Sequence, residues 1–298
     1  MAATIPFSKE LEFEYGEPSE LSPLIRRVVA QNPSAFTLYG TGTYIIGRGK
    51  VAIIDPGPAD PDHIEAILKA VEGEEITHIL ITHTHHDHSP GAALLKARIN
   101  APTYGYGPHG GDTNTWKAEE GGDLDFTPDI KVNDGDIIKA DGWSVRAIHT
   151  PGHLSNHICF ELIEEKTLFS GDHVMGWSTS VVSPPDGNMT DYMASLEKLF
   201  DYDHVRYWPT HGPCIDNPHE FVRGLIQHRQ SRMQQIRECL QSGPMTIPEM
   251  VRKMYTDVPE HLHPAAARSV YSHILMMVDK GEVASDGDLE VTDIYRLA

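Results

Sequence analysis

Residues 77–88 read THILITHTHHDH, an apolar segment typical of a buried strand that runs directly into a cluster of histidines. Within the cluster, His83, His85, Asp87 and His88 form an H-x-H-x-D-H pattern. Imidazole nitrogens and carboxylate oxygens are the donors that zinc and similar divalent ions prefer in proteins. Because the donors fall at positions i, i+2, i+4 and i+5, this loop can divide them between two neighbouring metal centres.

The residues before this loop predict two parallel strands joined by a helix. Residues 51–54 are an apolar strand that ends at Asp55, which we expect to hold the histidine loop rather than to bind a metal. Residues 61–71 follow the period of an amphipathic helix, with Asp60 as its N-cap. In such strand-helix-strand units, ligands bind beyond the carboxyl ends of the strands. The histidine cluster occupies this position.

Three further candidate ligands, His153, Asp172 and His211, each follow a short apolar segment and lie at a turn. A sheet directs side chains at such positions into a shared cleft. Taken singly, each residue is also compatible with a capping or surface role, but together they complete the ligand count that two metal ions require. We expect the surplus histidines of this region to support the centre or to lie on the surface: His86, His109, His149, His157 and His173.

A change of composition after residue 216 predicts three parts in the chain. Residues 1–216 carry the candidate ligands, and residues 217–241 predict a long polar helix that connects two domains. Residues 242–298 predict two helices followed by a hairpin with strands over 282–285 and 289–294. Two helices and a hairpin in so short a segment are typical of a winged helix.

The charge balance limits the partners that the chain can have. It carries 24 lysines and arginines against 43 acidic residues, a net charge of −19, and 18 histidines among 298 residues. An excess of histidine and carboxylate favours divalent metal ions, whereas the acidity disfavours the phosphate backbone of a nucleic acid. The sequence shows neither a secretory signal pattern nor a run of about 18 apolar residues, so we expect a cytoplasmic chain without a membrane partner. The sequence leaves the oligomeric state open.

The motifs resemble, in order and spacing, those of the metallo-β-lactamase fold superfamily over residues 36–215. The aspartate at position 172 makes the set similar to the glyoxalase II type and unlike the true metallo-β-lactamases, which usually lack it. The motifs that carry this resemblance are Asp55, the segment 83–88, His153, Asp172 and His211.

A second resemblance covers nearly the whole chain. It is to the β-lactamase-like proteins with a C-terminal winged helix, whose mitochondrial member is an endoribonuclease and whose bacterial members are mostly hydrolases of unassigned activity. The segments that carry it are residues 36–58 (FTLYGTGTYIIGRGKVAIIDPGP), 189–199 (MTDYMASLEKL), 209–213 (PTHGP) and 268–284 (RSVYSHILMMVDKGEVA).

The resemblance implies an α/β fold, namely an αββα sandwich with a dinuclear metal site at its edge. Two divalent ions, with zinc as the first choice and iron or manganese as alternatives, would share a hydroxide that attacks the substrate. Asp87 would also be the catalytic residue that orients this nucleophile or shuttles a proton. The implied ligands are His83, His85 and His153 for one ion, Asp87, His88 and His211 for the other, and Asp172 as the bridge.

The sequence indicates the class of reaction better than the substrate. Residues 242–298 carry five basic and nine acidic residues, so we expect the winged helix to be a packing element or one wall of the cleft rather than a nucleic-acid reader. We therefore favour hydrolysis of a small-molecule acyl substrate such as an ester, thioester, lactone or β-lactam. Two alternatives stay open, a metal-dependent endoribonuclease and a non-catalytic metalloprotein whose winged helix binds a partner. Candidates for the substrate wall are Tyr106, Met175, Trp177, Asn188 and Tyr192.

Overall fold

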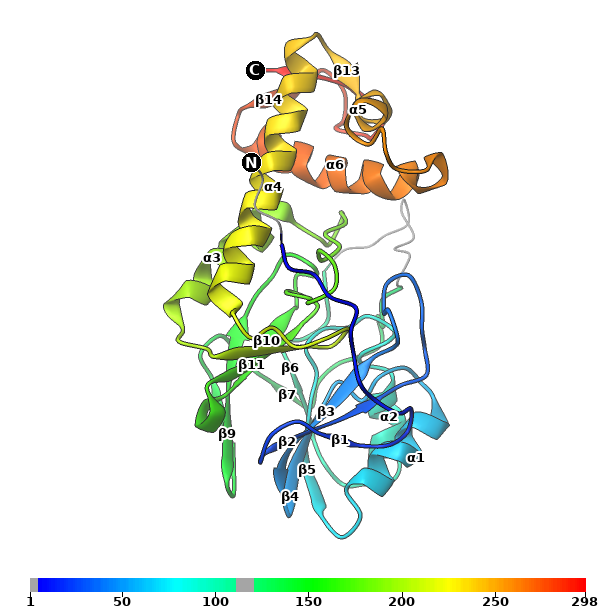
Figure 1. The fold of residues 1–298 in the computed structure, drawn as a ribbon, viewed down its shortest axis with the longest axis vertical. Helices are drawn as coiled ribbons and strands as arrows, with labels where there is room; N and C mark the ends of the chain where they lie inside the picture. The colour runs from blue at the N-terminus through cyan, green and yellow to red at the C-terminus, as the bar shows by residue number, and fades with distance from the viewer. Residues whose placement is uncertain (1–4, 111–120) are drawn as a thin grey trace.

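The computed structural model describes residues 5–110 and 121–298 and contains two β-sheets packed face to face, with helices on both outer sides (Figure 1). The larger sheet has the strand order β1-β2-β3-β4-β5-β6-β7. These strands are β1 (Ser19–Glu20), β2 (Ile25–Val29), β3 (Gly42–Arg48), β4 (Lys50–Ile54), β5 (Glu75–Leu80), β6 (Thr103–Gly105) and β7 (Ile130–Lys131). The smaller sheet has the order β12-β11-β10-β9-β8. Its strands are β8 (Ile137–Ala140), β9 (Trp143–His149), β10 (Ile158–Leu162), β11 (Thr167–Gly171) and β12 (Arg206–Pro209).

Helices cover the outer faces of the two sheets. The larger sheet packs against α1 (Pro61–Ala70) and α2 (Gly91–Lys96), and the smaller sheet against α3 (Met189–Lys198) and α4 (Pro218–Gln241) (Figure 1). As predicted, α1 begins after Asp60, whose side chain accepts a hydrogen bond from a backbone N–H of the first turn. This arrangement confirms the αββα sandwich. Among the described residues, no helix has both the length and the apolar character that a membrane span requires.

Alternation along the strands divides the apolar side chains between two layers. On β3, Tyr44 and Ile46 belong to the apolar cluster between the sheets, together with Phe160 of β10. Ile45, which lies between them in sequence, belongs instead to the cluster that contains Ile64 of α1. Successive side chains of a strand point to opposite faces of its sheet, so a single strand supplies both layers of the core.

The directions of the strands bring the candidate ligand segments to one edge of the sandwich. β4 is parallel to β5, and β11 is parallel to β12. β9 and β11 are both antiparallel to β10, so they run in the same direction. Carboxyl ends of parallel strands meet at one edge, where α/β sheets bind ligands. In chain order, Asp55 follows β4, residues 83–88 follow β5, His153 follows β9, Asp172 follows β11 and His211 follows β12.

The C-terminal part of the chain is the winged helix that the sequence predicts. It contains α5 (Ile247–Met254) and α6 (His263–Asp279). A small sheet with the order β13-β15-β14 accompanies them. Its strands are β13 (Met245–Thr246), β14 (Val283–Ser285) and β15 (Ile294–Leu297). Figure 1 shows this part at one end of the molecule, with α6 on the side that faces the sandwich.

The second strand of the wing lies further along the chain than the sequence predicts. We expected it over residues 289–294, but β15 only begins where that segment ends. Leu289 adopts a left-handed φ of 64°, and the carboxylate of Asp293 accepts a hydrogen bond of 2.9 Å from the backbone N–H of Glu290. These residues therefore form a turn. The alternation of Leu289 and Val291 reflects their packing against the core rather than a strand.

One apolar cluster joins the smaller sheet to the winged helix. It contains Leu168 of β11, Leu196 of α3 and Leu225 of α4. It continues through Ile274 of α6 and Tyr295 of β15, both of which are fully buried. The sandwich and the winged helix therefore share a core.

Gly152 is expected to tolerate no side chain, because its φ is 139° and a Cβ atom there would lie 2.3 Å from the Cα atom of Tyr192. Gly152→Ala should lower the free energy of unfolding by about 3 kcal/mol and should disturb the adjacent His153. The control is Gly142→Ala, because Gly142 also has a positive φ, 87°, but has open space around its Cβ position. This control should cost about 1 kcal/mol. Denaturant unfolding measures both variants, and equal losses would contradict the steric argument.

Candidate metal centre

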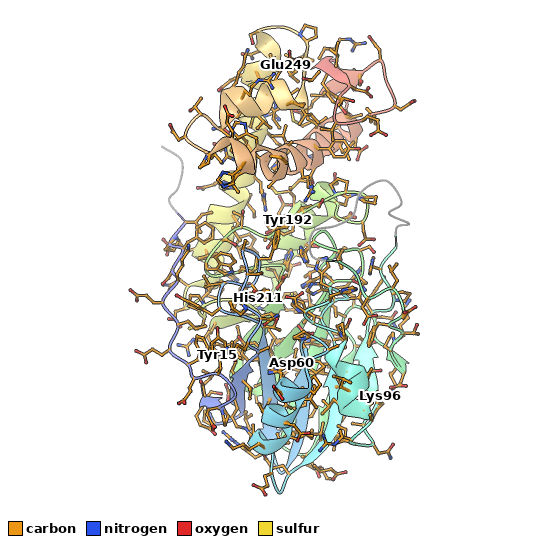
Figure 2. All side chains as sticks on the ribbon, turned by 90° about the vertical axis from the view of Figure 1, so that its right-hand side faces the viewer. Tyr15, Asp60, Lys96, Tyr192, His211 and Glu249 are labelled. Atoms are coloured by element: carbon orange, nitrogen blue, oxygen red, sulfur yellow. The ribbon has the colours of Figure 1, made fainter. Side chains whose placement is uncertain are left out.

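Seven side chains from both sheets converge at the shared edge of the sandwich. They form three overlapping groups, within each of which the possible ligand atoms lie within 4.8 Å of one another. All seven are buried except Asp87, whose side chain is 20% exposed. The structure therefore brings together every residue that the sequence indicates as a ligand, and Figure 2 shows the labelled His211 in the middle of the molecule. The groups are His83, His85 and His153; His83, His88 and Asp172; and Asp87, His88 and His211.

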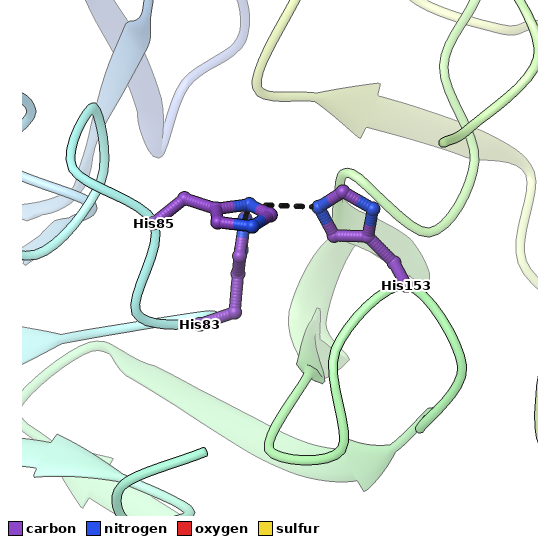
Figure 3. Close-up of side chains that lie close together, drawn as sticks. All are labelled: His83, His85 and His153. Carbon is purple, nitrogen blue, oxygen red and sulfur yellow. Dashed lines mark hydrogen bonds between the residues drawn. The ribbon is translucent and has the colours of Figure 1, made fainter. Parts of the chain in front are cut away.

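The first group consists of three imidazoles (Figure 3). The Nδ1 atom of His85 lies 3.0 Å from Nε2 of His83 and 3.0 Å from Nε2 of His153. Three nitrogens bound to one tetrahedral zinc ion, each at about 2.0–2.1 Å, lie about 3.3 Å from one another. The spacing of these three nitrogens is therefore close to that of a zinc site.

The third group combines two imidazoles with a carboxylate. Nε2 of His211 lies 3.1 Å from Oδ2 of Asp87, and Nε2 of His88 lies 3.5 Å from the same oxygen. Asp172, which belongs to the second group, lies between the first and the third, because its Oδ2 is 3.6 Å from Nε2 of His88 and 3.8 Å from Nε2 of His153. Its other oxygen, Oδ1, is 3.5 Å from Nε2 of His211. A carboxylate that faces both groups is placed to bridge two cations.

Hydrogen bonds on the outer side of the rings fix the direction of their lone pairs. Carbonyl and ionised carboxylate oxygens can only accept, so a ring nitrogen that contacts one of them carries the proton. The opposite nitrogen, Nε2, then directs its lone pair toward the centre, as a metal ligand must. Three rings donate from Nδ1 in this way: His88 to Oδ2 of Asp55 (3.0 Å), His153 to the carbonyl of Val181 (2.5 Å) and His211 to the carbonyl of Gly40 (3.1 Å).

Asp55 supports the histidine loop, as the sequence predicts. Its Oδ1 accepts a hydrogen bond of 2.8 Å from the backbone N–H of Thr82, and its Oδ2 accepts one of 2.7 Å from the Thr82 hydroxyl. The hydroxyl oxygen is then free to accept a hydrogen bond from Nδ1 of His83, which is 3.0 Å away. His83 therefore also presents Nε2 to the centre. Through Thr82 and His88, one buried carboxylate orients two of the rings.

Burial and neighbouring charges set the protonation states at the centre. Burial, together with the adjacent histidines, holds the pKa values of His83 and His85 well below the usual value, so both rings are neutral. Burial alone would lower the pKa of His211, but Asp172 and Asp87 raise it to about 10. Burial likewise opposes the ionisation of Asp172, yet His211 and a neighbouring imidazole hold its pKa well below its usual range. The centre therefore combines the neutral rings of His83 and His85 with ionised carboxylates and a protonated His211, whose proton a bound cation would displace.

Two buried polar atoms at the centre have no hydrogen-bond partner in the described parts of the chain: Nε2 of His88 and Oδ1 of Asp172. An unsatisfied buried polar group costs about 1–3 kcal/mol, and a charged one costs more. Both atoms belong to side chains of the groups described above, and both are donors that divalent cations prefer. The residues therefore fit a metal centre and can hold a metal ion.

The surplus histidines take supporting or peripheral places. His157 is buried beside the centre, and its Nε2 accepts a hydrogen bond of 3.1 Å from the backbone N–H of Asp172. His86 is exposed and donates to a backbone carbonyl on the outer side of the loop. The five surplus histidines of this region all lie outside the three groups: His86, His109, His149, His157 and His173.

Three of the five residues expected in the substrate wall have structural roles instead, so this part of the prediction is wrong. Asn188 is the N-cap of α3 and accepts hydrogen bonds from two backbone N–H groups of its first turn. Tyr192 is fully buried and donates its hydroxyl to a backbone carbonyl at 3.0 Å, and Met175 is also buried. Trp177 and Tyr106 are partly exposed.

The sequence analysis missed two features beside the centre. Arg229 of α4 is only 3% exposed, and its Nη2 donates a hydrogen bond of 2.6 Å to the carbonyl of Ser180. A signal for Arg229 existed, because it lies four residues from both Leu225 and Met233 on the buried side of α4. Residues 178–182 support the site through backbone carbonyls that accept hydrogen bonds. Every residue type has such a carbonyl, so the side-chain pattern of the sequence could not predict this role.

Two family models match the chain. The model described as the metallo-beta-lactamase superfamily matches residues 37–211, and the model described as the beta-lactamase associated winged helix domain matches residues 246–292. The chain belongs to the metallo-beta-lactamase superfamily. It is an enzyme of this superfamily of hydrolases, with a winged helix at its C-terminal end.

Relatives and solved structures agree with this assignment. The lactamase-like protein adaB of Aspergillus niger is 30% identical over 97% of this chain and 94% of that protein. The atrochrysone carboxyl ACP thioesterase dmxR1 of Cryptosporiopsis sp. is 30% identical over 86% of this chain and 77% of that protein. A beta-lactamase domain protein from Burkholderia ambifaria matches with a TM-score of 0.79 at 21% identity, over 95% of this chain and 94% of that chain. This last likeness shows the fold alone.

Asp55→Asn tests the support of the histidine loop. The asparagine oxygen can still accept from Thr82, but its NH₂ group faces the N–H of His88, so two donors oppose each other. We expect the affinity for zinc to fall by about 10-fold to 100-fold while the fold is retained. Competition with a chelator measures the affinity, and circular dichroism checks the fold. The control is Asp141→Asn, which removes an exposed carboxylate paired with Lys50, and equal affinities in the two variants would refute the role of Asp55.

Proposed function

We propose that the chain is a dinuclear, metal-dependent hydrolase that acts on a small acyl substrate. The observation that carries the proposal is the convergence of seven donor side chains, six of them in two groups of three and the seventh, Asp172, between these groups. A structural site for one ion closes with four ligands. Seven donors exceed that number, and their division by a shared carboxylate supports a site for two ions.

We infer that the two ions are zinc, because neutral imidazoles and carboxylates suit it, with iron and manganese as the alternatives that elemental analysis separates. When bound, such a pair supplies a nucleophile from water at neutral pH and polarises the oxygen of the substrate. The residues proposed to hold the pair are His83, His85 and His153 on one side, Asp87, His88 and His211 on the other, and Asp172 between them.

Asp87 is the proposed catalytic residue because it is the accessible donor. Its side chain is 20% exposed, whereas that of Asp172 is 6% exposed. Its Oδ2 also accepts a hydrogen bond of 3.4 Å from the hydroxyl of Thr41. Burial alone would raise the pKa of Asp87, but His88 and His211 hold it below the usual range, so the group is ionised at neutral pH. An ionised, accessible carboxylate can orient the attacking water and carry its proton.

An acyl substrate agrees with the charge of the chain and with one of its relatives. Hydrolysis adds water across the acyl bond and releases a carboxylic acid together with a thiol, alcohol or amine. The relative named as a thioesterase supports a thioester within this class. The net charge of −19 and the acidic winged helix disfavour RNA, and endoribonuclease activity is kept as the alternative that the assay tests.

We also propose that the chain is divided into three parts with different roles. Residues 1–216 form the catalytic domain, residues 217–241 the connector and residues 242–298 the winged helix. The bounds of α4, Pro218–Gln241, support this division. The packing of α6 against α3 supports a role for the winged helix as one wall of the cleft.

The proposed reaction is tested by turnover of nitrocefin, a lactone, a carboxylic ester, an acyl thioester and single-stranded RNA by the zinc-loaded protein. We expect acyl turnover and intact RNA. Each substrate is also assayed with Asp172→Ala, which removes the shared carboxylate. RNA cleavage that this variant abolishes would replace the acyl hydrolase by an endoribonuclease. Full metal content without turnover of any substrate would favour the non-catalytic metalloprotein.

His85→Ala and Asp172→Ala should each reduce activity by more than about a hundredfold, through loss of metal rather than loss of fold. His86→Ala is the matched control, because His86 is the exposed neighbour in the same loop. Elemental analysis measures the metal in each variant, and thermal unfolding checks the fold. Wild-type activity with a normal metal content in His85→Ala or Asp172→Ala would contradict the ligand assignment.

A further inference from the structure

A pocket of about 140 Å³ lies where the segment 179–182 meets Arg229 of α4 and the first turns of α6. We propose that this pocket binds an anionic group of the acyl substrate, a carboxylate or a phosphate, through the guanidinium of Arg229. The inference rests on the proposed function and adds the class of substrate. Residues that line the pocket include Phe36, Val181, Val182, Arg229, Arg268 and Ser269.

Arg229 is a buried cation without an anionic partner among the described residues. Its side chain makes one hydrogen bond, from Nη2 to the carbonyl of Ser180 at 2.6 Å, and its Nε has no partner. Its guanidinium also lies 5.3 Å from the centre of the Tyr192 ring, which compensates part of its desolvation. A buried arginine is normally paired with a carboxylate or phosphate, which it binds with two parallel hydrogen bonds. The substrate is the missing partner that we infer.

The two histidines beside Arg229 add no charge to its surroundings. Burial, and after it the charge of Arg229, lowers the pKa of His273 to about 3. Burial followed by the same charge lowers the pKa of His228 to about 4. Both rings are therefore neutral at pH 7. Arg268 brings a second guanidinium to the pocket from α6.

The pocket adjoins the metal centre through a single segment. Ser180 donates its hydroxyl to the carbonyl of Asp172 at 2.5 Å, and its own carbonyl accepts from Arg229. The next carbonyl, that of Val181, accepts the Nδ1–H of His153. Figure 2 shows the labelled Tyr192, which Arg229 covers, between the winged helix and His211. Residues 180 and 181 therefore contact both the metal centre and the residues that line the pocket.

A purely structural role would account for only part of the contacts of the Arg229 guanidinium. The hydrogen bond to Ser180 and the contact with Tyr192 account for one nitrogen and one face of the guanidinium. They leave Nε unsatisfied beside an open pocket that a second arginine also lines. An oxyanion in the pocket would satisfy the guanidinium of Arg229 and offset its charge.

Three thioesters test the proposal on the zinc-loaded protein. Acetyl-N-acetylcysteamine is neutral, succinyl-N-acetylcysteamine carries a carboxylate on its acyl part, and acetyl-phosphopantetheine carries a phosphate on its thiol part. We expect the wild-type protein to prefer one anionic thioester to the neutral one by about tenfold or more in kcat/KM, mainly through KM. The preferred compound shows which side of the scissile bond reaches the pocket. Equal kcat/KM values for all three would overturn the inference, whereas no turnover of any would contradict the proposed function.

Variants then connect the preference to the pocket. Arg229→Gln should reduce kcat/KM for the preferred anionic thioester about tenfold more than for the neutral one. The control is Arg223→Gln, which removes an exposed guanidinium from the same helix and should leave the preference unchanged. A parallel loss for all thioesters in Arg229→Gln would indicate a structural role and overturn the inference.

The test does not depend on a single variant. Should Arg229→Gln fail to fold by thermal unfolding and circular dichroism, Arg268→Gln, which alters a partly exposed side chain of the same pocket, replaces it. A reduced preference for the anionic thioester in Arg268→Gln supports the inference. An unchanged preference would place the recognised anion elsewhere and overturn it.

Discussion

The Nε2 atoms of four buried imidazoles face one another across the centre, and each ring is held there by a hydrogen bond on its far side. His83 is fixed through a hydroxyl, His88 through a carboxylate, and His153 and His211 through backbone carbonyls. Nε2 of His211 is protonated at pH 7 beside Asp87 and Asp172, and a cation bound at the centre would displace this proton and interact with the four nitrogens together. The strand ends and turns place these rings at one edge of the sandwich, and the buried Asp55 helps to orient them.

The ligands could be predicted from the sequence because metal binding leaves a pattern of residue types and spacings. The H-x-H-x-D-H segment and the three later strand ends were sufficient to predict the set that the fold brings together. The strand-helix-strand unit before the cluster was also predictable, since alternation and helical periodicity report which face is buried, whereas β1, β2, β6 and β7 were not predicted. The wing strand was misplaced because apolar alternation at Leu289 and Val291 also arises in a turn that packs on the core.

The wall of the cleft was harder to predict, because position along the chain does not determine which way a side chain faces. Asn188 and Tyr192 follow a ligand segment closely, yet one caps a helix and the other fills the core. The reverse applies to Arg229, which lies in a helix expected to be a polar connector but is buried beside the centre. Backbone carbonyls such as that of Val181 orient a ligand whatever side chain they carry, so no residue type marks them.

The apolar cluster that runs from β11 through α3 and α4 into α6 and β15 also determines how the molecule loses its structure. Separating the winged helix from the sandwich would expose side chains such as Ile274 and Leu196 to water, at about 25 cal/mol for each Å² of apolar surface. Elements joined by such a core open together rather than one after the other. The winged helix is consequently not an appendage that swings on a hinge: it and the sandwich form one cooperative unit of unfolding.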